Sequence, residues 1–151
     1  MTREIRLLAI SSDLPSQFEE LRREAGEAGY RFLDRLGEDW ETTRMRFDAP
    51  GEVLLTAHVR DDLAGIGGLT VDPDLSGAMR MRRFYVAKKF RRQGVGRTLA
   101  EALLDGAKGT TEVVTVNVGP KEAYPFWEAV GFQPVAADGH THELRLAGDS
   151  R

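Results

Sequence analysis

The sequence contains no cysteine. Disulfide bonds, thiolate metal sites and cysteine nucleophiles are therefore excluded together, so any catalysis must use other groups. The sequence also lacks an apolar run long enough to span a bilayer. Its first apolar stretch, MTREIRLLAISS, carries charges and predicts a strand, not a signal peptide. We therefore expect a cytoplasmic protein with no membrane partner.

Acidic and basic residues are unevenly distributed. The formal net charge of -3 gives no general attraction to nucleic acid or anionic lipid. The segment from Arg80 to Arg97 nevertheless contains eight Lys or Arg residues and no Asp or Glu. Such a run is usually a solvated basic face, and a local anion site is the alternative. The glycines at the end of the run favour the anion site.

The hydrophobic periodicity predicts one α+β domain over residues 1–147, followed by a polar tail at 148–151. Strands are expected at 3–10, about 53–59, 63–71, 79–86, 113–118 and 140–146. A helical region is expected to start at an N-cap at Ser12 or Asp13, with Pro15 in its first turn, and to divide at Gly26 and Gly29. Further helices are expected at 97–107 and 121–130. This order predicts a mixed, mainly antiparallel central sheet with helices on both faces.

The stretch FRRQGVGRTLAEALL (90–104) joins an expected strand to an expected helix. Gly94 and Gly96 allow positive φ and close approach, so successive backbone N–H groups can point at one anion. The helix beginning near Arg97 adds its unpaired N–H groups and positive dipole end. With several guanidinium groups nearby, a pyrophosphate fits better than a single carboxylate. A P-loop is set aside because Arg97 stands where its lysine belongs, and a dinucleotide fingerprint because its third glycine is missing.

Two segments resemble a known family. The segment VAKKFRRQGVG (86–96) is similar to motif A of the GNAT superfamily of acyl-CoA-dependent N-acetyltransferases, and AYPFWEAVGF (123–132) is similar to its motif B. The resemblance spans nearly the whole expected fold. It implies a GNAT-like fold and an enzyme that moves an acetyl group from acetyl-CoA to a primary amine of a small molecule or peptide, by direct attack in a ternary complex and without a metal.

The resemblance also implies a binding site for the acyl donor. Backbone N–H groups from Arg92 to Thr98 would hold the CoA pyrophosphate, with the Arg91 side chain assisting. The strand ending at Val86 would splay from its neighbour and pair with the pantetheine amides. The residues expected to bind the donor are Phe84, Tyr85, Val86, Arg91, Arg92, Gln93, Gly94, Val95, Gly96, Arg97, Thr98, Asn117 and Trp127.

The chain departs from the family pattern where a general acid is expected. Trp127 stands at the position where motif B usually carries the tyrosine that protonates the leaving thiolate, and an indole N–H is not a usable acid. Tyr124, one helical turn earlier, is the candidate catalytic residue, with packing as its alternative role. A thiolate with a pKa of roughly 8.5 can also leave without a proton.

The general base is not at its usual place either. The fourth expected strand carries Arg80, Arg82 and Arg83, where many family members have a glutamate. The remaining candidates are Asp72, Glu52, His58, His140 and His142, and relay through water is the default. The arginines raise the hypothesis of an acceptor with a negative group near its amine.

Two other functions compete with this interpretation. One is an acyl-CoA-binding module without turnover, which the tryptophan at position 127 favours. The other is a nucleic-acid-binding domain on the basic strip 80–97, which would need stacking aromatics and has only Phe84, Tyr85 and Phe90 nearby. We expect no nucleic-acid partner, and the family resemblance allows a homodimer.

Overall fold

The computed structural model describes residues 4–146, so the tail predicted at 148–151 lies outside the described residues. Its centre is a seven-stranded sheet in the order β1-β2-β3-β4-β5-β7-β6. The strands are β1 (Ile5–Ala9), β2 (Val53–Val59), β3 (Asp62–Val71), β4 (Ala78–Val86), β5 (Val113–Val116), β6 (Gln133–Pro134) and β7 (His142–Arg145). Strands β4 and β5 are parallel, and the other neighbours are antiparallel. The predicted mixed, mainly antiparallel sheet is confirmed.

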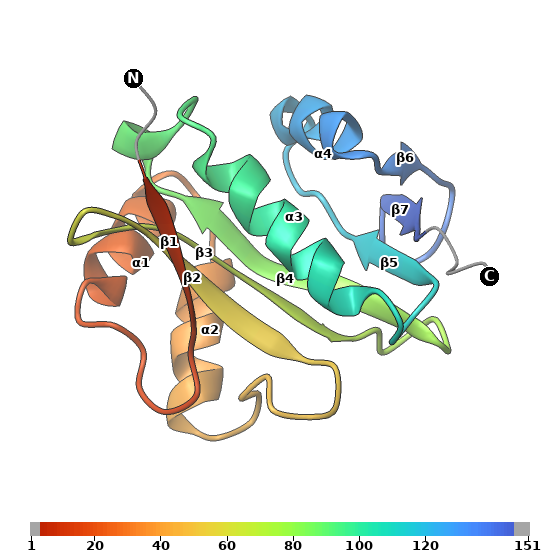
Figure 1. Cartoon of the computed structure of the whole chain (residues 1–151), viewed down its shortest axis with the longest axis horizontal. Helices are drawn as coiled ribbons and strands as arrows, with labels where there is room; N and C mark the ends of the chain where they lie inside the picture. Colours follow the sequence, from red (N-terminus) through yellow and green to blue (C-terminus); the bar gives the residue numbers. More distant parts are fainter. Residues whose placement is uncertain (1–3, 147–151) are drawn as a thin grey trace.

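Helices cover both faces of the sheet, as predicted (Figure 1). Helices α1 (Phe18–Glu27) and α2 (Phe32–Glu41) lie on one face, and α3 (Val95–Ala107) crosses the other. Helix α4 (Tyr124–Val130) lies near the β5–β7–β6 end. Two 3-10 turns, η1 (Lys88–Phe90) and η2 (Lys121–Ala123), precede α3 and α4. None of the helices within residues 4–146 is long and apolar enough to cross a membrane.

The apolar stripe of α3 forms the core with the middle strands. Leu99 and Leu103 are fully buried, as is Leu69 on β3. At about 25 cal/mol per Å² of apolar surface removed from water, each such side chain stabilises the fold by about 1.5–3 kcal/mol. This packing fixes α3 on β2 and β3, and with it the position of the helix N-terminus at the end of β4.

The predicted start of the first helix at Ser12 or Asp13 is wrong. Helix α1 begins at Phe18 and has no side-chain cap. The preceding residue, Gln17, is held by the β2–β3 turn: its Nε2 donates to the Asp61 carbonyl at 2.8 Å, and its Oε1 accepts from the Leu63 N–H at 2.9 Å. These tertiary bonds hold the chain in an irregular conformation that the local capping signal does not reveal. The predicted break is present at Gly29, which has φ +94, whereas Gly26 lies within α1.

The end of the chain also differs from the prediction in detail. The strand expected at 140–146 is limited to β7, and the two-residue strand β6 beside it was not predicted. Gln133 and Pro134 are exposed and pair with Glu143 and His142. A strand of two exposed residues has no hydrophobic alternation to detect.

Candidate active site

The sheet opens between β4 and β5. Their pairing consists of Ala78 with Val113, Met79 with Val114 and Arg80 with Thr115. Strand β4 continues to Val86, so its residues 81–86 have no partner on β5. A register shift against β3 marks a bulge in β4, where Arg83 has φ +56. The splay implied by the family resemblance is therefore present, and it leaves one edge of β4 unpaired.

Val86 directs its backbone groups into this opening. The Ala87 N–H donates to the Ala64 carbonyl at 2.8 Å, which makes Val86 and Gly65 a non-hydrogen-bonded pair of the antiparallel ladder. The N–H and C=O of Val86 therefore point away from β3. The carbonyl accepts from Arg91 Nε at 2.9 Å, and no bond within residues 4–146 uses the N–H.

An anion-binding helix N-terminus lies directly beyond the end of β4. Gly94 precedes α3 with φ +88, and the first carbonyl-bonded N–H of the helix is that of Thr98, at 3.0 Å from the Gly94 oxygen. Within residues 4–146, the N–H groups of Val95, Gly96 and Arg97 have no hydrogen-bond partner. The first turn contains no acidic residue. Free N–H groups and an uncompensated dipole are what a phosphate requires.

The arginines around this turn differ in what they contact. Arg91 bonds to Val86, as described above, and so holds the loop against the end of β4. Arg97 pairs with Glu101 at 2.9 Å on the exposed side of α3. Arg92 is exposed, has φ +63, and forms no ion pair with another residue of the range 4–146. Of the three, Arg92 has the guanidinium most available to an anion.

Aromatic side chains connect β4 to α4 beside the opening. The Phe84 ring lies 4.8 Å from the Trp127 ring and 5.7 Å from the Phe126 ring. Trp127 is buried and also contacts Phe132, with 5.4 Å between centroids. Gly96 allows this approach, because a Cβ there would come within 3.1 Å of the Phe126 ring. Trp127 thus packs α4 against β4 instead of offering an acidic proton.

Tyr85 faces the opposite side of the sheet from Phe84. Its hydroxyl donates to Glu24 Oε2 at 2.6 Å, and the same oxygen accepts from the Lys88 N–H at 3.0 Å. Burial, followed by the hydrogen bond and charge of Glu24, raises the pKa of Tyr85. Tyr85 therefore ties β4 to α1. Glu24 was not predicted in this role, because it is one of several acidic residues in the expected helical region and no local pattern distinguishes it.

Tyr124 lies at the start of α4, half-buried, with its ring edge against His142 at 4.7 Å between centroids. His142 is fully buried; its Nε2 is 3.0 Å from Glu128 Oε2 and its Nδ1 is 2.8 Å from Thr141 Oγ1. These contacts fix the imidazole and, through it, the neighbouring phenol ring. Asn117, which was predicted to help bind the acyl donor, is exposed just beyond the end of β5.

Asp72, a candidate base, is fully engaged by other groups. Its Oδ1 accepts from the N–H groups of Asp74 and Leu75 at 2.7 and 3.0 Å, and its Oδ2 accepts from Thr115 Oγ1 at 2.6 Å. Arg80 approaches to 3.4 Å. Burial alone would raise the pKa of this carboxyl, but the hydrogen bonds and the charge of Arg80 lower it overall. Asp72 holds the β3–β4 hairpin to β5.

The other candidate bases also have partners. Glu52 accepts from the N–H groups of Ala49 and Val71. His58 is buried on β2, with Thr56 Oγ1 at 2.9 Å, and burial together with Arg6 lowers its pKa. His140 Nε2 lies 2.8 Å from Glu143 Oε2. No three His, Asp or Glu side chains among residues 4–146 are grouped so that they could hold a metal ion.

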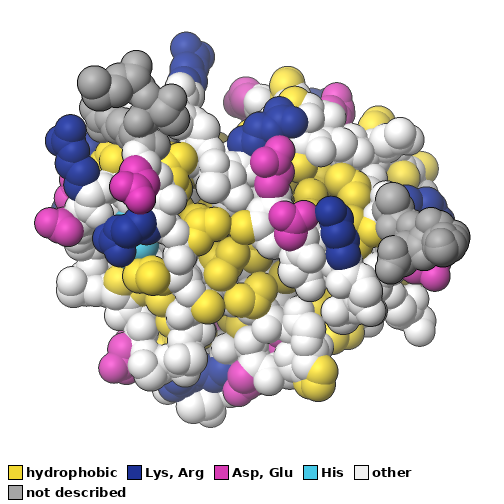
Figure 2. All heavy atoms as spheres, viewed as in Figure 1, with side chains coloured by type: hydrophobic (Ala, Val, Ile, Leu, Met, Phe, Trp, Pro, Cys, Tyr) yellow, Lys and Arg dark blue, Asp and Glu magenta, His cyan; other side chains and the backbone are white. Residues whose placement is uncertain are grey.

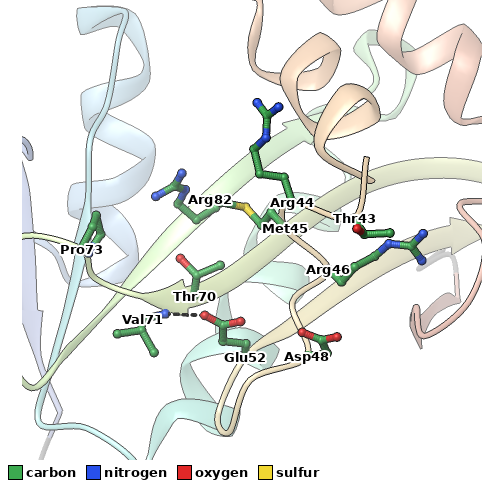
Figure 3. Close-up of a pocket in the computed structure, with 10 residues that line it drawn as sticks. All are labelled: Thr43, Arg44, Met45, Arg46, Asp48, Glu52, Thr70, Val71, Pro73 and Arg82. Atoms are coloured by element: carbon green, nitrogen blue, oxygen red, sulfur yellow. Dashed lines mark hydrogen bonds between the residues drawn. The ribbon is translucent and has the colours of Figure 1, made fainter. Parts of the chain in front are cut away.

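A cavity of about 670 Å³ lies between the α2–β2 connection, the end of β3 and the middle of β4 (Figure 3). Its lining residues are Thr43, Arg44, Met45, Arg46, Asp48, Glu52, Thr70, Val71, Pro73 and Arg82. Arg82 comes from the part of β4 that has no β5 partner. The cavity therefore adjoins the segment of strand that borders the opening.

The basic strip 80–97 does not form a single surface. Arg80 and Arg83 pair with carboxylates beside β4, whereas Arg92 and Arg97 lie at the N-terminal end of α3. On the face seen in Figure 2, basic and acidic side chains are interspersed around the apolar middle. The arrangement provides separate local anion sites in place of a continuous track.

Comparison with known proteins gives a family and a fold. The model of the acetyltransferase (GNAT) domain family matches residues 20–147. The tRNA(Met) cytidine acetyltransferase TmcA of Pectobacterium atrosepticum is 36% identical over 84 residues, which are 54% of this chain and 12% of that protein. The chain thus matches only a small part of the length of this relative.

Solved structures show the same fold at low sequence identity. One from Exiguobacterium sp. 255-15 has a TM-score of 0.84 at 21% identity, covering 94% of this chain and 93% of the other. The PaiA N-acetyltransferase of Thermoplasma acidophilum, in complex with coenzyme A, has a TM-score of 0.67 at 17% identity, covering 95% and 99%.

Proposed function

Since the chain belongs to the GNAT family of acetyltransferases, we propose that it transfers an acetyl group from acetyl-CoA to a primary amine of a small molecule or peptide. One observation carries this proposal. The unpaired edge of β4 leads directly to the free N–H groups at the start of α3, so an extended ligand ending in a pyrophosphate fits the chain from Val86 to Arg97.

The proposed donor site uses backbone more than side chains. The N–H groups of Val95, Gly96 and Arg97 would hold the pyrophosphate, with the Arg92 guanidinium beside them. Residues 81–86 would pair with the amides of the pantetheine arm. Acetyl-CoA, when bound, supplies an activated thioester. The residues present fit it, because Gly94 has open space where a Cβ would project.

Positioning would provide most of the rate enhancement. Holding the amine next to the donor contributes about 7–11 kcal/mol at the favourable limit of proximity effects. The free N–H of Val86 points into the opening and would stabilise negative charge on the reacting carbonyl oxygen. Tyr124 would donate the proton to the leaving thiolate. Water would take the proton of the amine, because the candidate carboxylates and histidines are engaged elsewhere.

An RNA acceptor is a second candidate, because the matching relative TmcA is a tRNA(Met) cytidine acetyltransferase. The division of the basic residues between two regions argues against it. A cytoplasmic location and homodimerisation belong to the proposal on the strength of the sequence and the family.

The test is a thermal melt with acetyl-CoA, CoA and ATP at matched ionic strength, followed by thiol release on a panel of amines and on tRNA. A saturable stabilisation by both CoA species but not by ATP, of the size that mass action predicts, supports the donor site. Thiol release with amines then separates an enzyme from a binder without turnover. Absence of any stabilisation by CoA contradicts the proposed site, and release with tRNA alone favours the second candidate.

A further inference from the structure

The three arginines of β4 do not have equivalent partners. Arg80 lies 3.4 Å from both Asp72 and Asp74, and Arg83 lies 3.3 Å from Asp39. The guanidinium of Arg82, between them, forms neither an ion pair nor a hydrogen bond with any residue of the range 4–146. It is half-buried and lines the cavity described above.

The surroundings of Arg82 favour an anion. Burial, and then the charges of Arg83 and Arg80, lower the pKa of Arg82, while the charges of Asp39 and Asp72 act in the opposite direction. A guanidinium partly removed from water without a partner loses hydration, and a bound oxyanion would compensate for this. The planar guanidinium fork matches the two oxygens of a carboxylate or phosphate.

Other polar groups of the cavity are consistent with a ligand. Thr70 Oγ1 is buried and has no hydrogen-bond partner among the described residues, so it can serve a ligand atom. Of the two acidic residues in the lining, Glu52 has both oxygens occupied by backbone N–H groups. Asp48 is exposed at the other side of the cavity from Arg82 in Figure 3.

We propose that the acceptor is an amine that also carries an oxyanion, either a carboxylate or a phosphate, and that Arg82 binds this oxyanion in the cavity. The inference rests on the proposed acetyl transfer and names the class of its acceptor. Arg82 lies two residues beyond the last β4–β5 pair, on the strand that borders the opening. The oxyanion bound there would hold the acceptor next to the place where the thioester lies.

The experiment compares matched amines on the intact protein with CoA bound, so that binding is read without turnover. The pairs are β-alanine with β-alaninamide, γ-aminobutyrate with its amide, and O-phosphoethanolamine with ethanolamine. The variants are Arg82→Gln and, as a control for the loss of one positive charge, Arg145→Gln, which lies exposed on β7. Calorimetric titration gives the affinities, and an unchanged CoA affinity shows that each variant is folded.

We expect the wild type to bind the anionic member of at least one pair 10-fold or more tighter than the neutral member. Arg82→Gln should remove this preference, and Arg145→Gln should keep it. Equal or tighter binding of the neutral amines by the wild type overturns the proposal, as does an anion preference that survives in Arg82→Gln. A failure of acetyl transfer itself would appear separately, in the acetyl-CoA assay described above, as amines that bind but release no thiol.

Discussion

Gly94 and Gly96 serve the start of α3 in different ways. Gly94 has φ +88, which an L side chain rarely adopts, and open space where a Cβ would be. Gly96 has an ordinary helical backbone, but a Cβ there would approach Phe126 to 3.1 Å and Val86 to 3.4 Å. The first glycine shapes the turn that presents the N–H groups, and the second lets α4 pack against it.

Replacing Gly94 by alanine should weaken acetyl-CoA binding beyond its effect on folding. The left-handed backbone disfavours alanine by roughly 1–2 kcal/mol, and the new methyl group projects where a phosphate would approach. Gly109→Ala is the matched control, since Gly109 lies beyond the other end of α3 with φ +83 and equally open space. We expect both variants to melt earlier, but only Gly94→Ala to lose most of the stabilisation by acetyl-CoA. Equal stabilisation of both would contradict the phosphate site.

Tyr124 supplies a hydroxyl on α4, whereas position 127, where the family motif usually has a tyrosine, is a tryptophan. Tyr124→Phe should lower kcat about 10²-fold near pH 7 if this hydroxyl donates the proton. The deficit should shrink above the pKa of a thiol, roughly 8.5, because the thiolate then leaves unprotonated. Tyr30→Phe is the control, since Tyr30 lies on the α1–α2 side near Tyr85. An unchanged kcat at pH 7 would leave Tyr124 with a packing role only.

At the scale of elements, β4 joins the parts of the site. Its first residues pair with β5, and its end presents the backbone of Val86 to the opening. Between them, the bulge at Arg83 inserts one extra residue, which changes the face of the sheet to which the following side chains point. The strand is held in place by buried polar contacts, through Asp72 to Thr115 and through Arg83 to Asp39. The first contact ties the β3–β4 connection to β5 at the paired end, and the second ties β4 to α2 beside its unpaired segment.

The Asp72 contact predicts a pH dependence of stability. Its pKa in the folded state is lowered below the unfolded value of about 3.9, so its stabilisation is full above that pH and is lost as the pH falls through the folded pKa. Asp72→Asn should therefore reduce the free energy of unfolding by about 1–3 kcal/mol at pH 7. The difference from wild type should narrow below about pH 4.

Urea melts between pH 7 and pH 3 measure this difference. Asp74→Asn is the control, because Asp74 lies more exposed on the same turn and approaches the same arginine. A constant difference for Asp72→Asn across the whole pH range would show that its carboxylate charge is not the stabilising feature.

At the scale of the whole molecule, the sheet consists of two parts joined at one parallel pair of strands. The larger part contains β1 to β4, and the smaller contains β5, β7 and β6 with α4. Three strand-paired residues on each side join them, together with the hydrogen bond from Thr115 to Asp72. A donor bound in the opening would contact both parts, and would therefore stabilise their relative position.

Hydrogen exchange should reveal this division. We expect the amides of β5 and β7 to exchange faster than those of β2 and β3, since short strands near an edge open at lower free energy. Acetyl-CoA should slow exchange at residues 81–86 and 93–98 and, through the joint, in β5. Protection by acetyl-CoA confined to β1 and β2 would contradict the proposed site.

Much of the fold was predictable because local and long-range signals agree. The strands from 53 to 86 and the apolar stripe of α3 have clear periodicity, and their elements form within a few residues of the predicted bounds. The start of α1 was not predictable, because the bonds from Gln17 to the β2–β3 turn override the local capping signal. The contact between Glu128 and His142 could not be predicted from the sequence either, because the two residues lie on α4 and β7 and no local pattern specifies how these elements pack.

The sequence by itself determined the order of the elements apart from β6, the glycine turn and the family to which the chain belongs. These depend on local backbone preferences and on contiguous motifs, which involve only residues close together in the sequence. Only the tertiary structure decided which arginine of β4 is left without a partner, and that Val86 points its N–H into an opening. Both depend on where distant residues such as Asp39 and Ala64 lie in space, because ion pairing and strand register are properties of the packed chain.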